Sequence, residues 1–199
     1  MAGKRRKDTR STKKNEIQII LNMGVEPRRI IYANTVKSTQ HIKFAQAHGV
    51  TLMTFDCTEE LCKVKDKNIR LLLRIMSDED DSSIPFDQKF GCSISEARHI
   101  LEVARDLGCN VVGVAFHVGV THKNPEVFAR SIEQAKAIFD LAAEMGNPLT
   151  VLNIGGGFPG GLRSLNKYKQ VRACFFFYIC SLHYVYEVGL RFLWETKPS

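Results

Sequence analysis

The stretch Val111-Val-Gly-Val-Ala-Phe-His-Val-Gly119, followed after a helical segment by Leu149-Thr-Val-Leu-Asn-Ile-Gly155, decides the fold of this chain. Both runs have the length of a strand and are hydrophobic almost throughout, which is typical of strands buried on both faces of a parallel sheet. Three earlier runs share this pattern: Arg29–Asn34, Val50–Asp56 and Ile69–Ile75. The sequence therefore predicts a series of buried strands.

Helical patterns lie between the later strands. Ser93-Ile-Ser-Glu96 has the spacing of a capping box, and Gly108 supplies a stop. Apolar residues recur at helical intervals between them: Ile94, Ala97, Ile100, Leu101, Ala104 and Leu107. A second helix has Asn124 and Pro125 at its start and a stripe that ends before Gly146: Phe128, Ile132, Ala135, Phe139 and Ala142. This alternation predicts an α/β fold, either a barrel or a doubly wound sheet.

The positive charge of the chain is concentrated at its N-terminus. The formal net charge is +7, and the first fourteen residues contribute most of it through Lys4, Arg5, Arg6, Lys7, Arg10, Lys13 and Lys14. A nucleic-acid-binding domain spreads basic residues over a folded face, so we predict a disordered basic tail over residues 1–14 and no nucleic-acid partner. The alternative is a nuclear-import or anionic-surface patch.

The cysteines and the apolar segments indicate the compartment. The six cysteines form no C-x-x-C pair and no apolar signal segment follows Met1, so we predict reduced thiols in a cytoplasmic or nuclear protein. Residues 166–199 form a divergent hydrophobic tail, whose uniformly apolar part is shorter than the roughly 20 residues that a membrane-spanning helix needs. No membrane association is expected.

Two strand ends carry candidate functional groups. His117 and the run Gly155-Gly-Gly157 each follow a buried strand, at the edge where α/β folds place their chemistry. Glycine amides can approach an anion closely. The alternatives are a structural histidine and a bend that needs unusual dihedral angles. His117 and His122 lack an acidic or thiol partner at metal spacing, so no metal is assigned.

The combination of these motifs resembles a known family. Phe116-His-Val-Gly119 followed by Asn153-Ile-Gly-Gly-Gly-Phe-Pro-Gly160 is similar to the eukaryotic ornithine decarboxylases and antizyme inhibitors, the group IV pyridoxal-phosphate decarboxylases. Further matches run in order from Lys14 to Gly160 and include Lys14-Asn-Glu-Ile-Gln18 and Leu73-Arg-Ile75. The resemblance implies an alanine racemase-like (β/α)₈ barrel. About five of its eight βα units would lie within residues 15–165, without the C-terminal β domain.

The resemblance also implies a cofactor site. His117 would stack on the ring of pyridoxal 5'-phosphate, the backbone of Gly155, Gly156 and Gly157 would hold its phosphate, and Arg74 and Glu16 would line the site. Val120 stands where the family's decarboxylases have a phosphate-binding serine, and Asn153 stands where they have an aspartate. The lost hydroxyl is expected to cost about 1–3 kcal/mol of cofactor affinity.

The resemblance leaves three functions open. The family's Schiff-base lysine lies upstream of every matched block, so no catalytic residue is assigned and we expect an inactive relative of ornithine decarboxylase, the enzyme that makes putrescine for polyamine biosynthesis. The second reading is an antizyme-inhibitor-like regulator that binds antizyme through Thr39–Lys63. The third is a non-functional splice or pseudogene product with an intron-derived tail. The family's homodimer is the expected assembly of its complete members.

Overall fold

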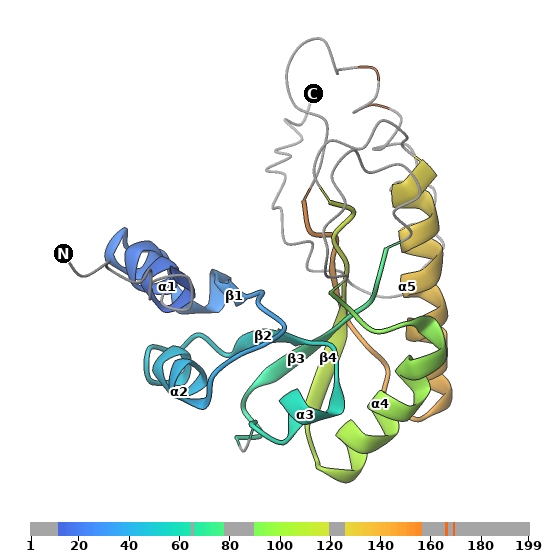
Figure 1. The fold of residues 1–199 in the computed structure, drawn as a ribbon, viewed down its shortest axis with the longest axis horizontal. Coiled ribbons are helices and arrows are strands. Elements are labelled where there is room, and N and C mark those ends of the chain that lie inside the picture. Colours follow the sequence, from blue (N-terminus) through green and yellow to red (C-terminus); the bar gives the residue numbers. More distant parts are fainter. Residues whose placement is uncertain are drawn as a thin grey trace, which may run out of the picture. The chain divides into compact units, whose positions relative to one another are not determined.

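The computed structural model describes residues 12–64, 66–77, 90–119 and 126–156, together with Asn166 and Lys169. Strands and helices alternate along this part of the chain (Figure 1). The strands are β1 (Ile31–Tyr32), β2 (Leu52–Phe55), β3 (Arg70–Arg74), β4 (Asn110–Ala115) and β5 (Val151–Asn153). The helices are α1 (Thr12–Asn22), the 3₁₀ helix η1 (Pro27–Arg29), α2 (Thr39–Ala47), α3 (Thr58–Leu61), α4 (Ile94–Asp106) and α5 (Glu126–Glu144).

The strands follow one another in the order β1-β2-β3-β4-β5. The pairs β1–β2, β2–β3 and β4–β5 are parallel. Sequential parallel strands joined by helices are the pattern of a (β/α) barrel and not of a doubly wound sheet, whose strand order reverses. The predicted fold class, an incomplete (β/α)₈ barrel, is confirmed. All five predicted strands are present, each shorter than its hydrophobic run.

The first compact unit comprises Met1–Arg74 and Phe90–Val112. All residues of β2 and the three central residues of β3 are buried, as near-continuous hydrophobicity predicts. Helix α4 begins with the predicted capping box, in which the Ser93 side chain accepts from the Glu96 backbone N–H and the Glu96 side chain accepts from the Ser93 N–H. Leu107, the last of the apolar residues at helical intervals, lies just after the helix and is 50% exposed.

The N-terminal boundary of this unit differs from the predicted one. Helix α1 begins at Thr12, so Thr12–Lys14 belong to a helix and not to a tail. The Lys14 ammonium lies 4.7 Å from the centroid of the Phe44 ring of α2, a cation–π contact between the two helices. The rest of the predicted basic tail lies outside the described residues.

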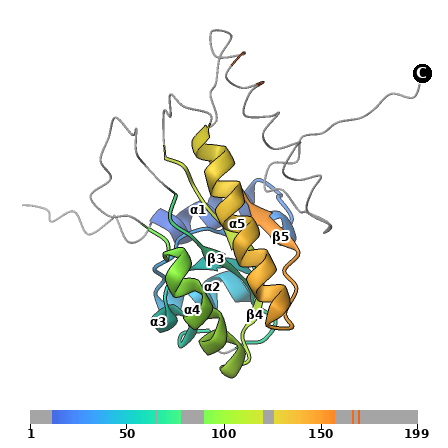
Figure 2. The same ribbon diagram turned by 90° about the vertical axis from the view of Figure 1, so that its right-hand side faces the viewer.

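The second compact unit comprises Ile75–Lys89 and Gly113–Ser199. Helix α5 lies beside β5 (Figure 2) and buries the predicted stripe from Phe128 to Ala142. A Cβ added to Gly113 would lie 1.9 Å from the Val151 carbonyl oxygen, so β4 and β5 can pair closely only because this residue is glycine. The predicted cap, Asn124 and Pro125, lies outside the described residues, as does the predicted tail except Asn166 and Lys169.

Candidate cofactor site

His117 lies two residues beyond the end of β4. Its neighbours Phe116 and Val118 are almost completely buried, whereas His117 itself is exposed. The two buried side chains hold the backbone so that the imidazole is turned out of the core. The Gly119 backbone N–H donates to Nδ1 of His117 over 2.9 Å, so Nδ1 is unprotonated and a neutral ring carries its proton on Nε2. The backbone of this segment thereby sets both the place and the tautomer of the ring.

A glycine turn follows β5 next to this histidine. Gly155 has a φ of +63°, and a Cβ at this position would lie 2.3 Å from the Phe116 carbonyl oxygen. A Cβ at Gly156 would lie 3.0 Å from Nε2 of His117. The Phe116 N–H donates to the Asn153 carbonyl over 2.9 Å, which ties the ends of β4 and β5 together. Side chains are thus excluded from the turn, and its backbone lies against the imidazole.

The side chain of Asn153 shapes the same turn. Its Oδ1 accepts a hydrogen bond from the Gly155 N–H over 2.9 Å, the geometry of an Asx turn. The Gly155 amide is therefore already used within the chain. The Gly156 amide makes no hydrogen bond to any residue that the structure describes, so it is the donor open to an anion. Gly157 and Val120 lie outside the described residues.

Arg74, the last residue of β3, belongs to the first compact unit. Its guanidinium carbon lies 5.5 Å from the centroid of the Phe90 ring. Burial lowers the pKa of Arg74, and the negative charge of Asp56 opposes this shift. The other predicted site residue of this unit, Glu16, is exposed on α1. Arg74 and Glu16 thus lie in one unit, and His117, Gly155 and Gly156 lie together in the other.

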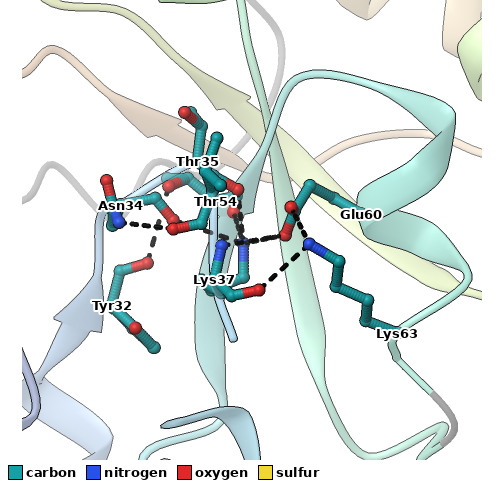
Figure 3. Close-up of polar contacts among 8 residues, drawn as sticks. Tyr32, Asn34, Thr35, Lys37, Thr54, Glu60 and Lys63 are labelled. Atoms are coloured by element: carbon teal, nitrogen blue, oxygen red, sulfur yellow. Dashed lines mark hydrogen bonds and ion pairs between the residues drawn. The ribbon is translucent and has the colours of Figure 1, made fainter. Parts of the chain in front are cut away.

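A buried ionic network in the first unit has no counterpart in the sequence analysis (Figure 3). The side chain of Lys37 is fully buried, and its ammonium donates to the carbonyls of Asn34, Thr35 and Thr54 over 3.2, 2.9 and 2.5 Å. Glu60 Oε2 lies 3.4 Å from the same ammonium. Burial lowers the pKa of Lys37, and the attraction of Glu60 counteracts this shift.

Glu60 connects this lysine to helix α3. Its carboxylate accepts the backbone N–H of Lys37 over 3.1 Å and pairs with the ammonium of Lys63. The Lys63 ammonium also donates to the Lys37 carbonyl over 3.0 Å. The segment after β1, the end of β2 and helix α3 are therefore held as one body. A lysine between Val36 and Ser38 carries no local signal of burial, so the sequence could not reveal this network.

Other chemistries find little support in the described part of the chain. No group of three or more histidine, cysteine, aspartate or glutamate side chains there is arranged to hold a metal ion. Cys57, Cys62, Cys92 and Cys109 are free thiols. None of the helices described is long and apolar enough to cross a membrane. The groups suited to a ligand are the imidazole, the open Gly156 amide and the Arg74 guanidinium.

Comparison with known proteins identifies the family of the chain. The family model described as pyridoxal-dependent decarboxylase, pyridoxal binding domain, matches residues 8–174. The chain is 40% identical over 160 residues to the ornithine decarboxylase of Rattus norvegicus and equally to antizyme inhibitor 2 of Xenopus laevis. Each alignment covers 79% of this chain but 35% of the relative, so the chain spans about a third of the length of these proteins.

A solved structure extends the likeness to the fold. The arginine decarboxylase of Paramecium bursaria Chlorella virus superposes with a TM-score of 0.79 and 33% sequence identity, covering 88% of this chain and 49% of that one. The sequence model, the relatives and the fold lead to the same conclusion: the chain belongs to the family of the pyridoxal-binding domain of pyridoxal-dependent decarboxylases.

Proposed function

We propose that this chain is an ornithine decarboxylase-related polypeptide that binds pyridoxal 5'-phosphate without a covalent tether and does not decarboxylate ornithine by itself. The observation that carries the proposal is the placement of the His117 imidazole against the side-chain-free backbone of Gly155 and Gly156. The likeness of the chain to ornithine decarboxylases and to an antizyme inhibitor supports the choice of substrate class.

The residues present fit this cofactor. An imidazole held by the Gly119 N–H offers a flat face to the pyridine ring, and the open Gly156 amide is a donor for the phosphate. Asn153 holds the turn in the required conformation through the Gly155 N–H. When bound, pyridoxal phosphate supplies an electron sink for cleavage of the bond to the substrate carboxylate.

Two of the described lysines are already engaged within the chain. The ammonium of Lys37 is fully buried and surrounded by three carbonyls and a carboxylate, so it is closed to an aldehyde. In the described part of the second unit, Lys136 pairs with Asp140 over 2.5 Å on an outer face of α5.

The test is a titration of the purified full chain with pyridoxal phosphate, read by equilibrium dialysis. We expect saturable binding at one site that is weakened at least tenfold by His117→Ala and is left unchanged by the exposed-residue control His99→Ala. After borohydride reduction, peptide mass spectrometry is expected to find no stoichiometric pyridoxyl group on any one lysine, and carboxyl-labelled ornithine is expected to release no labelled carbon dioxide. A single labelled lysine together with carbon dioxide release would overturn the proposal.

A second candidate function is antizyme binding through Thr39–Lys63. The favouring observation is that the Lys37–Glu60–Lys63 network ties α3 to the segment that leads into α2, so this region presents one surface. Lys43 is exposed on α2 and offers a basic contact to an acidic partner.

Capture of this chain by immobilised antizyme tests the second function. We expect retention that falls with Lys43→Glu but not with Lys67→Glu, which changes an exposed residue outside the segment. Absence of capture by folded wild-type chain would rule this function out.

A further inference from the structure

Arg74, the last residue of β3, is half-buried. Its guanidinium makes no hydrogen bond or ion pair with any described residue, although Asp56 is near enough to influence its charge. Guanidinium groups that are partly removed from water normally gain a carboxylate or carbonyl acceptor, because desolvation of an unpaired cation is costly. The N–H groups of Arg74 are therefore available to an anionic ligand.

The Phe90 ring supports this guanidinium from one side. The separation of 5.5 Å between the guanidinium carbon and the ring centroid lies within the range of a cation–π interaction. A ring that covers one face of the guanidinium leaves the N–H groups at its edge free. Phe90 is 43% exposed, so its ring is accessible at the surface.

The segment that carries this ring is attached at two further points. The Gly91 N–H donates to Asp56 Oδ2 over 3.1 Å, and the Cys92 N–H donates to the Arg74 carbonyl over 2.9 Å. Gly91 has a φ of +111°, which disfavours any residue with a Cβ. Cys92 is 4% exposed, so its side chain anchors the segment in the core. The backbone next to Phe90 is thus held in place by hydrogen bonds to Asp56 and to the end of β3.

We infer that Phe90 and Asp56 are positioning residues for Arg74. The Phe90 ring orients the guanidinium, and the Asp56 carboxylate holds the segment Phe90–Cys92, which carries that ring. Arg74 is the group that meets an anionic ligand of the first unit. The orientation of Arg74 does not depend on the proposed function, whose site lies in the second unit.

The experiment measures the reactivity of Arg74 toward phenylglyoxal in the full chain, by peptide mass spectrometry, relative to the exposed Arg105. Loss of the ring in Phe90→Leu is expected to raise the relative rate of Arg74 modification about two- to fivefold, the range that corresponds to one exposed cation–π contact. Phe90→Tyr keeps the ring and is expected to restore the wild-type rate. Phe44→Leu removes the ring of another cation–π pair and serves as the matched control.

Two Asp56 variants separate positioning from a merely structural role. In Asp56→Asn, the amide oxygen can still accept the Gly91 N–H, so we expect Cys92 to stay protected from alkylation. In Asp56→Ala the acceptor is lost, and we expect faster alkylation of Cys92 together with faster modification of Arg74. Circular dichroism shows that each variant is folded.

The outcomes distinguish this inference from the proposed function. Unchanged Arg74 reactivity in folded Phe90→Leu overturns the inference, as does a change that Phe90→Tyr fails to reverse. If Arg74 responds as expected but the wild-type chain binds no pyridoxal phosphate, the orientation of Arg74 is supported and the proposed function is overturned.

Discussion

Gly155 shows how a single residue holds the candidate site together. Its positive φ and the short distance that a Cβ would make to the Phe116 carbonyl act independently, so substitution by alanine strains the backbone and forces β4 and β5 apart. We expect Gly155→Ala to lower the free energy of unfolding by more than about 2 kcal/mol, because a left-handed conformation alone costs about 1–2 kcal/mol in a residue with a Cβ. Urea denaturation measures this change.

Gly24 provides the matched control for that prediction. It has a φ of +79° but no atom within 4 Å of the position of a Cβ. Gly24→Ala is therefore expected to lose only the free energy that the left-handed backbone conformation costs. Equal destabilisation of the two variants would contradict the proposed clash with Phe116.

Cys92 gives the first unit a pH-dependent stability. Burial, the charge of Glu96 and that of Asp56 raise the pKa of this thiol from 9.0 to about 12. The unfolded chain ionises above pH 9 while the folded chain keeps its proton, so the contribution of Cys92 is complete below pH 9 and is lost as the pH rises toward 12. The expected slope is about 1.4 kcal/mol per pH unit in that window.

The measurement compares unfolding free energies of wild type and Cys92→Ala between pH 8 and about 10.5, a range chosen to span the lower half of the window. We expect the difference between the two proteins to shrink as the pH rises. Cys62→Ala, which changes an exposed thiol, is expected to follow the wild-type pH dependence. A constant difference for Cys92→Ala would show that the thiol is not protected from ionisation.

At the scale of elements, the start of α4 depends on its capping box. Ser93 and Glu96 satisfy each other's backbone N–H groups at the first turn of this helix, which then buries Ala97, Ile100 and Leu101. We expect Ser93→Ala to cost about 0.5–2 kcal/mol of unfolding free energy. Thermal and urea unfolding measure this loss, and His99→Ala on the exposed side of the same helix is expected to have less than half the effect.

The Lys37 network joins three elements, so we expect its loss to lower the free energy of unfolding more than loss of the capping box does. Removing its ammonium leaves three buried carbonyls without their shared donor and takes from Glu60 one of its two ammonium partners, the other being Lys63. We expect Lys37→Met to destabilise the chain by about 3–5 kcal/mol, the range for breaking a buried ion pair. Lys43→Met, on the exposed side of α2, is the control for urea unfolding. A stable Lys37→Met variant would show that hydrophobic packing replaces the network.

At the scale of the whole molecule, ligand binding and folding are linked. A ligand that binds only the folded chain at a hundred times its dissociation constant stabilises it by about 2.7 kcal/mol. Under the proposed function, we expect saturating pyridoxal phosphate to raise the urea midpoint of the wild-type chain. In Gly156→Ala a Cβ would lie 3.0 Å from Nε2 of His117, so we expect the protection to be lost. Equal protection of both chains would place the cofactor elsewhere.

The sequence predicted features that depend on neighbours along the chain. The hydrophobic runs gave the five strands, the Ser93–Glu96 spacing gave the start of α4, and the strand-end positions of His117 and the glycines indicated the site. Strand length was overestimated, because hydrophobic residues such as Phe116 and Val118 continue past the end of the strand and are buried without belonging to it.

By itself, the amino-acid sequence determined the alternation of strands and helices and the position of the glycine turn after its strand, since these follow from local periodicity and backbone freedom. Only the tertiary structure decided that Lys37 is buried on Glu60, 23 residues away, and that Asp56 holds Gly91 across 35 residues. It also decided that Asn153 uses the Gly155 amide, whereas the Gly156 amide has no acceptor among the described residues. The physical reason is that the partner of a buried polar group is chosen by chain folding, which brings distant residues within hydrogen-bond distance, and not by the residues on either side of it.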